Sequence, residues 1–155
     1  MKRFIVTTIL TVVIAGVLAH FMPRSFTHYL SKFDAESTVT IYCRQTELNA
    51  VDMGGGCGYK VECNVASYLD TAAHCQGIDG VCVSFAGSRK DVDSLCRYFR
   101  MQVSSVYEQS GLYVVSGASS KLRGGVTDGE NKINLQIAFS NGVVLVGSPL
   151  ILGDY

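Results

Sequence analysis

The sequence has few charged side chains and no excess of either sign. Charged residues make up 17% of the 155 residues, below the roughly 25% that is usual in soluble domains. Thirteen basic side chains balance thirteen acidic ones, and without Lys2 and Arg3 the count is 11 against 13. Such a surface lacks the electrostatic footprint of a nucleic-acid binder. We therefore expect no nucleic-acid partner.

Motifs of several common chemistries are also missing. The chain has no Cys-x-x-Cys, which argues against a zinc knuckle and a thioredoxin-type pair. No Gly-Lys-Ser/Thr accompanies the glycines at 54–58, as a phosphate-binding loop would require. The segment Thr71–Cys75 looks like the surroundings of a serine-protease histidine, but Asp70 precedes it and no Gly-Asp-Ser-Gly follows. His74 and Cys75 are neighbours on a predicted helix, so their side chains do not face each other.

The closest carboxylate pairs, Asp91 with Asp93 and Asp128 with Glu130, are explained by solvated helix and turn positions. No spacing of metal ligands is present. We therefore predict no catalytic residue, no metal site and no cofactor, and a protein that is not an enzyme. A basic helix face is also conceivable, although Asp91 and Asp93 dilute it; it would consist of Arg89, Lys90, Arg97 and Arg100.

The N-terminus carries the pattern of an export segment. Lys2 and Arg3 precede an uncharged run from Phe4 to Ala19, and Val17-Leu18-Ala19 fits a signal-peptidase site. Read to Met22, the apolar stretch spans roughly 28 Å as a helix, close to the ~30 Å of a bilayer core. Residues 1–22 are thus a signal peptide or a membrane anchor, and membrane contact through residues 4–22 is expected if they are not cleaved. Residues 23–37 read as a stalk.

The remaining residues, 38–155, predict a single extracytoplasmic α+β domain. Alternating or β-branched patterns predict strands at 38–44, 59–63, 81–85, 101–107, 112–116, 132–140 and 143–146. Helical spacing predicts a helix after Asn64 that reaches Cys75, with Gly77 as its stop signal, and another after Ser88. Asn141-Gly142 is the turn signal of a closing hairpin. The strands at 101–107 and 112–116 are expected to turn near Ser110-Gly111. The fold class expected is α+β: a mostly antiparallel sheet with two helices packed on one face, after an N-terminal hydrophobic helix.

Six cysteines occur, an even number that is typical of disulfides outside the cytoplasm and allows 15 pairings. Our candidate disulfide joins Cys43 and Cys63, which lie on strands expected to pair. The alternative is that all six stay reduced, with thiols such as Cys75 and Cys96 acting as small hydrophobes on apolar faces.

The C-terminal half resembles a known family. The resemblance rests on Val106-Tyr107, Gly111–Val115, Lys132–Phe139, Gly147–Ile151 and Asp154-Tyr155, which look like the end of YwmB-like proteins. It covers about Phe85 to Tyr155. It implies an exported protein of a Gram-positive bacterium, with a fold like that of the TATA-box-binding protein and no implied DNA binding.

Three functions remain open at this point. The first is a non-enzymatic cell-envelope domain, membrane-anchored or secreted, that binds a partner protein or an envelope polymer. The second is a thiol-dependent redox or hydrolytic enzyme that uses one of the six cysteines. The third is a structural subunit of an envelope assembly, joined through exposed strand edges.

Overall fold

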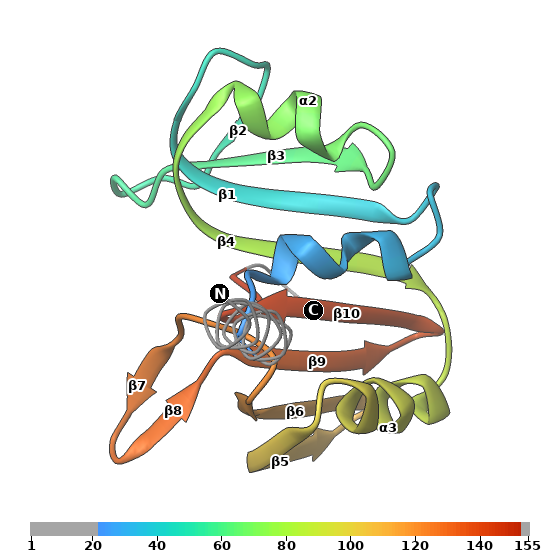
Figure 1. Ribbon diagram of the computed structural model, residues 1–155. Helices are drawn as coiled ribbons and strands as arrows, with labels where there is room; N and C mark the ends of the chain where they lie inside the picture. Colours follow the sequence, from blue (N-terminus) through green and yellow to red (C-terminus); the bar gives the residue numbers. More distant parts are fainter. Residues whose placement is uncertain (1–21, 153–155) are drawn as a thin grey trace, which may run out of the picture.

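An antiparallel sheet of eight strands, in the order β2-β3-β1-β4-β10-β9-β6-β5, forms the body of the protein (Figure 1). The computed structural model describes residues 22–152. The strands of this sheet are β1 (Thr38–Thr46), β2 (Val51–Asp52), β3 (Tyr59–Asn64), β4 (Cys75–Ala86), β5 (Met101–Gln109), β6 (Leu112–Ser119), β9 (Leu135–Ser140) and β10 (Val143–Ser148). A separate hairpin consists of β7 (Val126–Asp128) and β8 (Asn131–Ile133). The α+β class and the mostly antiparallel sheet are confirmed.

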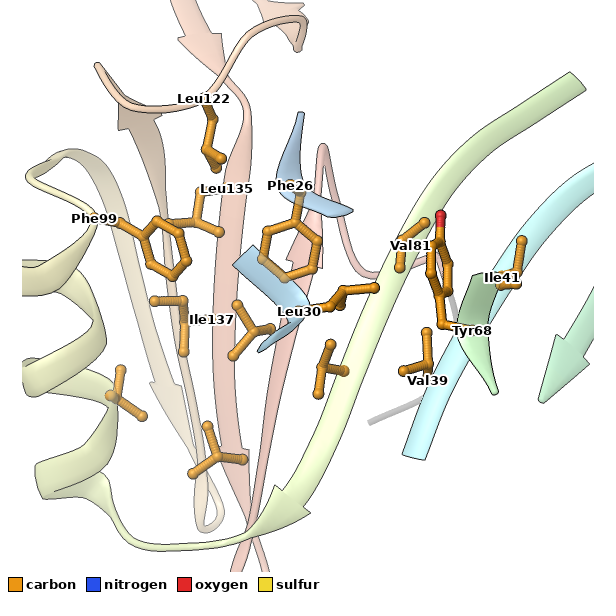
Figure 2. Close-up of a cluster of buried hydrophobic side chains, with 14 of the residues drawn as sticks. Phe26, Leu30, Val39, Ile41, Tyr68, Val81, Phe99, Leu122, Leu135 and Ile137 are labelled. Carbon is orange, nitrogen blue, oxygen red and sulfur yellow. The ribbon is translucent and has the colours of Figure 1, made fainter. Parts of the chain in front are cut away.

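Three helical segments contribute to one hydrophobic core on the sheet. They are the 3-10 helix η1 (Phe26–Lys32) and the α-helices α2 (Tyr68–Ala73) and α3 (Arg89–Tyr98). Each sends buried side chains into the cluster that also holds Val39, Ile41 and Ile137 of the sheet. Figure 2 shows Phe26, Leu30 and Phe99 meeting Leu135 and Ile137 there. The predicted hydrophobic helix at the N-terminus lies outside the described residues, apart from Met22.

The segment 23–37, expected as a stalk, packs into the domain. Phe26 and Leu30 of η1 are each only 4% exposed. The rings of Phe26 and Phe99 lie 6.1 Å apart, and those of Tyr29 and Phe99 lie 5.4 Å apart. The sequence shows a short amphipathic turn here, and burial of its apolar side draws the segment onto the sheet.

Two of the predicted hairpin turns are confirmed by their backbone angles. Asn141 and Gly142, between β9 and β10, have φ of 49° and 80°. Ser110 and Gly111, between β5 and β6, have φ of 51° and 84°. Positive φ at both central residues is the requirement of a type I′ turn, whose twist matches that of the flanking strands.

The helix predicted from Asn64 to Cys75 is shorter in the structure. Asn64 accepts hydrogen bonds from the N–H and hydroxyl of Ser67, both at 2.8 Å, and α2 starts only at Tyr68. Cys75 is not on the helix, because it begins β4 opposite Thr46 of β1. Gly77, predicted as a helix stop, lies inside β4 with φ of 63°. Long-range pairing with β1 thus overrides the local helical pattern.

The predicted strand 132–140 is divided at Asn134. Residues before it pair in the β7–β8 hairpin, and residues after it form β9 between β6 and β10. Asn134 is 1% exposed. Its side chain accepts from Ser119 N–H and donates to the carbonyls of Ser119 and Leu122. The alternating pattern gave no sign of this break, because an Asn on the polar side of a strand reads as exposed.

Helix α3 begins as predicted after Ser88. Ser88 and Asp91 form a capping box, in which the Asp91 carboxylate accepts from the Ser88 N–H and hydroxyl at 2.8 Å. These bonds lower the pKa of Asp91. Asp91 thus has a structural role in capping the start of the helix.

The opposite face of the sheet carries a second, smaller cluster. Its buried members are Tyr42, Cys82, Val114, Ala138 and Ile151. Ile151 follows β10, and its N–H donates to Gln136 Oε1 at 3.0 Å. The residues after β10 therefore fold back over this face near its centre, leaving the part formed by β5 less covered.

Candidate functional site

The structure places His74 and Cys75 in different elements. His74 is exposed and ends α2, while Cys75 starts the following strand. The Cys75 Sγ donates to the Thr71 carbonyl at 3.5 Å. The same thiol also contacts the Thr46 hydroxyl at 3.9 Å.

Three thiols lie together between α2 and the sheet. Cys43 is hydrogen-bonded to Cys75. The thiol of Cys63 is hydrogen-bonded to Thr71, whose carbonyl accepts from Cys75. Cys43 is buried in the main core, and Cys63 and Cys75 pack against it half-buried. The sequence did not indicate this cluster, because Cys75 was expected on a helix.

The candidate disulfide between Cys43 and Cys63 is not formed, and both are free thiols. Their strands β1 and β3 do pair as expected, but Cys63 lies opposite Val39 and Cys43 lies opposite Tyr59. The two cysteines are thus four positions apart along β1, or roughly 13 Å. A disulfide needs Cα atoms within about 7 Å. Strand pairing was predicted correctly, and the register was not.

The four thiols with shifted acidity are all weaker acids than usual. Burial, and then the neighbouring Cys75, raise the pKa of Cys43 to about 11. Burial raises the pKa of Cys82 to about 12. The pKa values of Cys63 and Cys96 are raised as well, again chiefly by burial. A nucleophilic cysteine requires the opposite shift.

Strand β5 is an open sheet edge with apolar side chains on its surface. Eight of its nine residues are exposed. Val103, Val106 and Tyr107 keep 48%, 56% and 50% of their surface accessible. The strand carries one charge, Glu108, and no proline. A bulge between Val103 and Ser105 interrupts the first part of the strand and leaves the stretch from Ser105 to Gln109 regular, with Glu108 as its only charge.

The other edge of the sheet is built differently. It ends in β2, which has only two residues and pairs with Tyr59 and Lys60 of β3. A very short edge strand offers little backbone for another chain to pair with. The rest of β3, residues 61–64, runs beside α2 (Figure 1). Of the two edges, the β5 edge is therefore the one suited to recruiting a further strand.

The direction of the free backbone groups on β5 follows from its turn. Gln109 and Leu112 flank the two-residue turn and form the closing pair. Hydrogen-bonded and non-hydrogen-bonded pairs alternate along an antiparallel ladder. Tyr107 therefore directs its backbone groups to β6, while Val106 and Glu108 direct theirs to the outer side. The edge presents two N–H and two C=O groups within three residues.

A groove of about 490 Å³ lies beside the same strand. Its walls come from β5, β6 and the β7–β8 hairpin, together with Leu150 after β10. The apolar side chains that line it are Tyr107, Leu112, Val114, Val126, Ile133 and Leu150. Ser105 and Tyr107 of β5 both face it, so the groove adjoins the open edge.

The opposite side of β5 is held by α3. Arg89 donates to both carboxylate oxygens of Glu108, at 2.6 and 2.9 Å, and its guanidinium stacks 3.9 Å from the Tyr113 ring centre. Arg97 donates to Ser94 on its own helix, and Arg100 lies beyond the end of α3. The four cations thus do not act as one basic face, since Arg89 is used to fasten α3 to β5.

The chain matches no protein-family model, no curated protein and no solved structure. Among residues 22–152, no helix has the length and apolar character needed to cross a bilayer. The same part of the chain contains no group of three or more His, Cys, Asp or Glu side chains placed to hold a metal ion.

Proposed function

We propose that this protein is a non-enzymatic, exported cell-envelope domain of the YwmB-like kind, from a Gram-positive bacterium, that binds a partner protein by strand addition at β5. The observation that carries the proposal is the contrast between the two sheet edges. One is nine residues long and exposed, and the other ends in a two-residue strand. An extended peptide paired with β5 would use its outward backbone groups for affinity.

The groove beside β5 would supply specificity. In strand addition, alternate side chains of the added peptide enter pockets on one face of the sheet. The apolar walls around Tyr107 and Val126 fit an aliphatic or aromatic side chain, and Asp128 at the rim fits a neighbouring donor. This favours a protein partner over an envelope polymer, because a polysaccharide offers no backbone ladder.

The proposal is tested by crosslinking in cells. A photoreactive amino acid at position 107 should give a discrete protein adduct, while the same probe at exposed Asp70 on α2 should not. Val106→Pro removes an outward N–H and should abolish the adduct. Val106→Ala keeps that N–H and should retain it, which separates backbone pairing from side-chain contact. Thermal unfolding of each variant confirms that the domain is folded.

The outcomes distinguish the other functions. An adduct with the mass of a dimer of this chain would identify a subunit of a homo-oligomeric assembly. No protein adduct, together with retention of the domain on cell-wall polymer, would overturn strand addition. A thiol-dependent enzyme is disfavoured by the raised pKa values of Cys43, Cys63, Cys82 and Cys96.

A further inference from the structure

A second surface, to which β5 contributes no residue, gathers positive charge near the start of the described chain. Arg24, Arg100 and Lys121 surround a hollow of about 490 Å³, together with Tyr29 and Tyr98. We call these five residues the basic patch. They come from the segment leading into η1, the η1 helix, the end of α3, and the loop between β6 and β7.

Backbone hydrogen bonds fix the patch in place. Arg24 N–H donates to the Lys121 carbonyl at 2.8 Å, and Arg123 N–H donates to the Arg24 carbonyl at 2.9 Å. The Tyr29 hydroxyl donates to the same Lys121 carbonyl at 3.3 Å. The chain next to Met22 is therefore part of the folded domain and is held against the loop that carries Lys121.

The charge of the patch is not neutralised locally. No carboxylate lines the hollow. Within residues 22–152, the ion pairs formed are Arg44–Asp79, Lys60–Glu62 and Arg89–Glu108, and none involves Arg24, Arg100 or Lys121. Arg24 donates to the ring of His28, which also lines the hollow, and Lys121 donates to the Tyr98 carbonyl, so neither partner is a carboxylate. In a chain with no net charge, three cations without an acidic partner around one hollow make a local site for an anion.

Aromatic side chains accompany these cations. Tyr98 is 37% exposed, and Lys121 Nζ lies 4.1 Å from its ring centre. The Tyr29 ring packs edge-on, 6.3 Å from Tyr98. Tyrosine rings beside lysine and arginine are typical of surfaces that meet the headgroup region of a bilayer. Met22, which also lines the hollow, is 64% exposed.

We propose that the basic patch binds the phosphate headgroups of anionic phospholipids and thereby seats the domain on the membrane. The occupant follows from the chain itself: Met22 and Arg24 line the hollow, and the uncharged run from Phe4 to Ala19 ends just before them. The inference uses the expected anchor but not the strand-addition site, because β5 contributes nothing to this hollow. Seating through the patch would leave β5 free for its partner.

The absence of tryptophan from the sequence permits a direct test. The full chain with Tyr98→Trp is placed in nanodiscs of phosphatidylglycerol or phosphatidylcholine that contain a headgroup-labelled quencher. We expect fluorescence quenching several-fold stronger in phosphatidylglycerol, and lost in high salt. The matched control, Tyr107→Trp on β5, should be quenched weakly and equally in both lipids.

Charge removal completes the test. In the same nanodiscs, Arg100→Gln and Lys121→Gln, each added to the Tyr98→Trp chain, should each weaken the seating that the quenching in phosphatidylglycerol reports about fivefold, while Lys90→Gln on α3 should leave it unchanged. Equal quenching of the Tyr98→Trp variant in the two lipids overturns the proposal, as does binding insensitive to these substitutions. Inorganic phosphate at millimolar concentration should compete poorly, and strong competition would assign the hollow to a free anion instead. None of these results alters the crosslinking outcome at position 107.

Discussion

Asn134 holds both backbone groups of Ser119: its Oδ1 accepts the Ser119 N–H at 2.6 Å, and its Nδ2 donates to the Ser119 carbonyl at 3.0 Å. A further bond from Nδ2 reaches the Leu122 carbonyl at 2.9 Å. Ser119 in turn donates its hydroxyl to the Phe99 carbonyl. The end of β6, the end of α3 and the start of β9 are thus joined through one buried amide.

Asn134→Ala should therefore be strongly destabilising. It leaves a buried N–H and two carbonyls without their partner, and each unsatisfied group costs about 1–3 kcal/mol. We expect the free energy of unfolding to fall by about 3 kcal/mol or more in denaturant titrations. Asn131→Ala, at an exposed position of β8, is the matched control and should change it by less than about 0.5 kcal/mol. Equal effects of the two substitutions would contradict the buried network.

Leu30→Ala tests whether the segment 23–37 belongs to the core. Leu30 is 4% exposed between η1 and the sheet, and truncation of a buried leucine costs about 2–5 kcal/mol. Ser31→Ala, on the exposed side of η1, should be nearly neutral. If the Leu30→Ala variant were as stable as the parent, segment 23–37 would not be part of the core, and the interpretation as a stalk would be preferred.

Stability should decrease at alkaline pH because of Cys82. Its pKa is 9.0 when exposed and is raised to about 12 by burial in the fold. Below pH 9 the thiol is protonated in both states, so its contribution is fully present. As the pH rises from about 9 towards 12, the unfolded chain releases this proton while the folded chain keeps it, and folding loses free energy. Urea midpoints measured across this range should fall, and less so in Cys82→Ala than in Cys57→Ala.

Thiol labelling should follow exposure. Cys57 is exposed in the loop between β2 and β3, whereas Cys43 and Cys82 are buried with raised pKa values. The thiolate is the reactive form. A pulse of iodoacetamide at pH 7.5 should therefore modify Cys57 in the folded protein, whereas Cys43 and Cys82 should be modified only after unfolding. Peptide mass mapping at successive times would show the order in which the three thiols are modified. Rapid modification of Cys43 at this pH would instead support the hypothesis of a thiol-dependent enzyme.

The local signals in the sequence predicted local structure well. Asn141-Gly142 and Ser110-Gly111 gave their hairpins because a type I′ turn depends on two adjacent residues. Ser88 gave the start of α3 because its cap bond spans three positions. In each case, the deciding contacts lie within a few residues of the signal.

The errors arose where distant segments decided the outcome. Cys75 lies in a strand and not in the predicted helix, because it pairs with β1. Cys43 and Cys63 do not lie opposite each other, because the register of a pair depends on the sequences of both strands. Strand β5 was expected as a strand beside residues 112–116, and this was correct. The position of β5 at the edge of the sheet could not be predicted. An alternating pattern shows which side chains share a face of the sheet, but it does not show which strands lie next to each other.

The position of β10 sets a condition on assembly of the sheet. Residues 143–148 lie between β4 and β9, and they alone join the first half of the sheet to the second. A nascent or translocating chain that has emerged only to residue 142 holds two separate three- and four-stranded pieces, each with a bare flank. The two parts of the sheet can therefore join only after residues 143–148 have emerged.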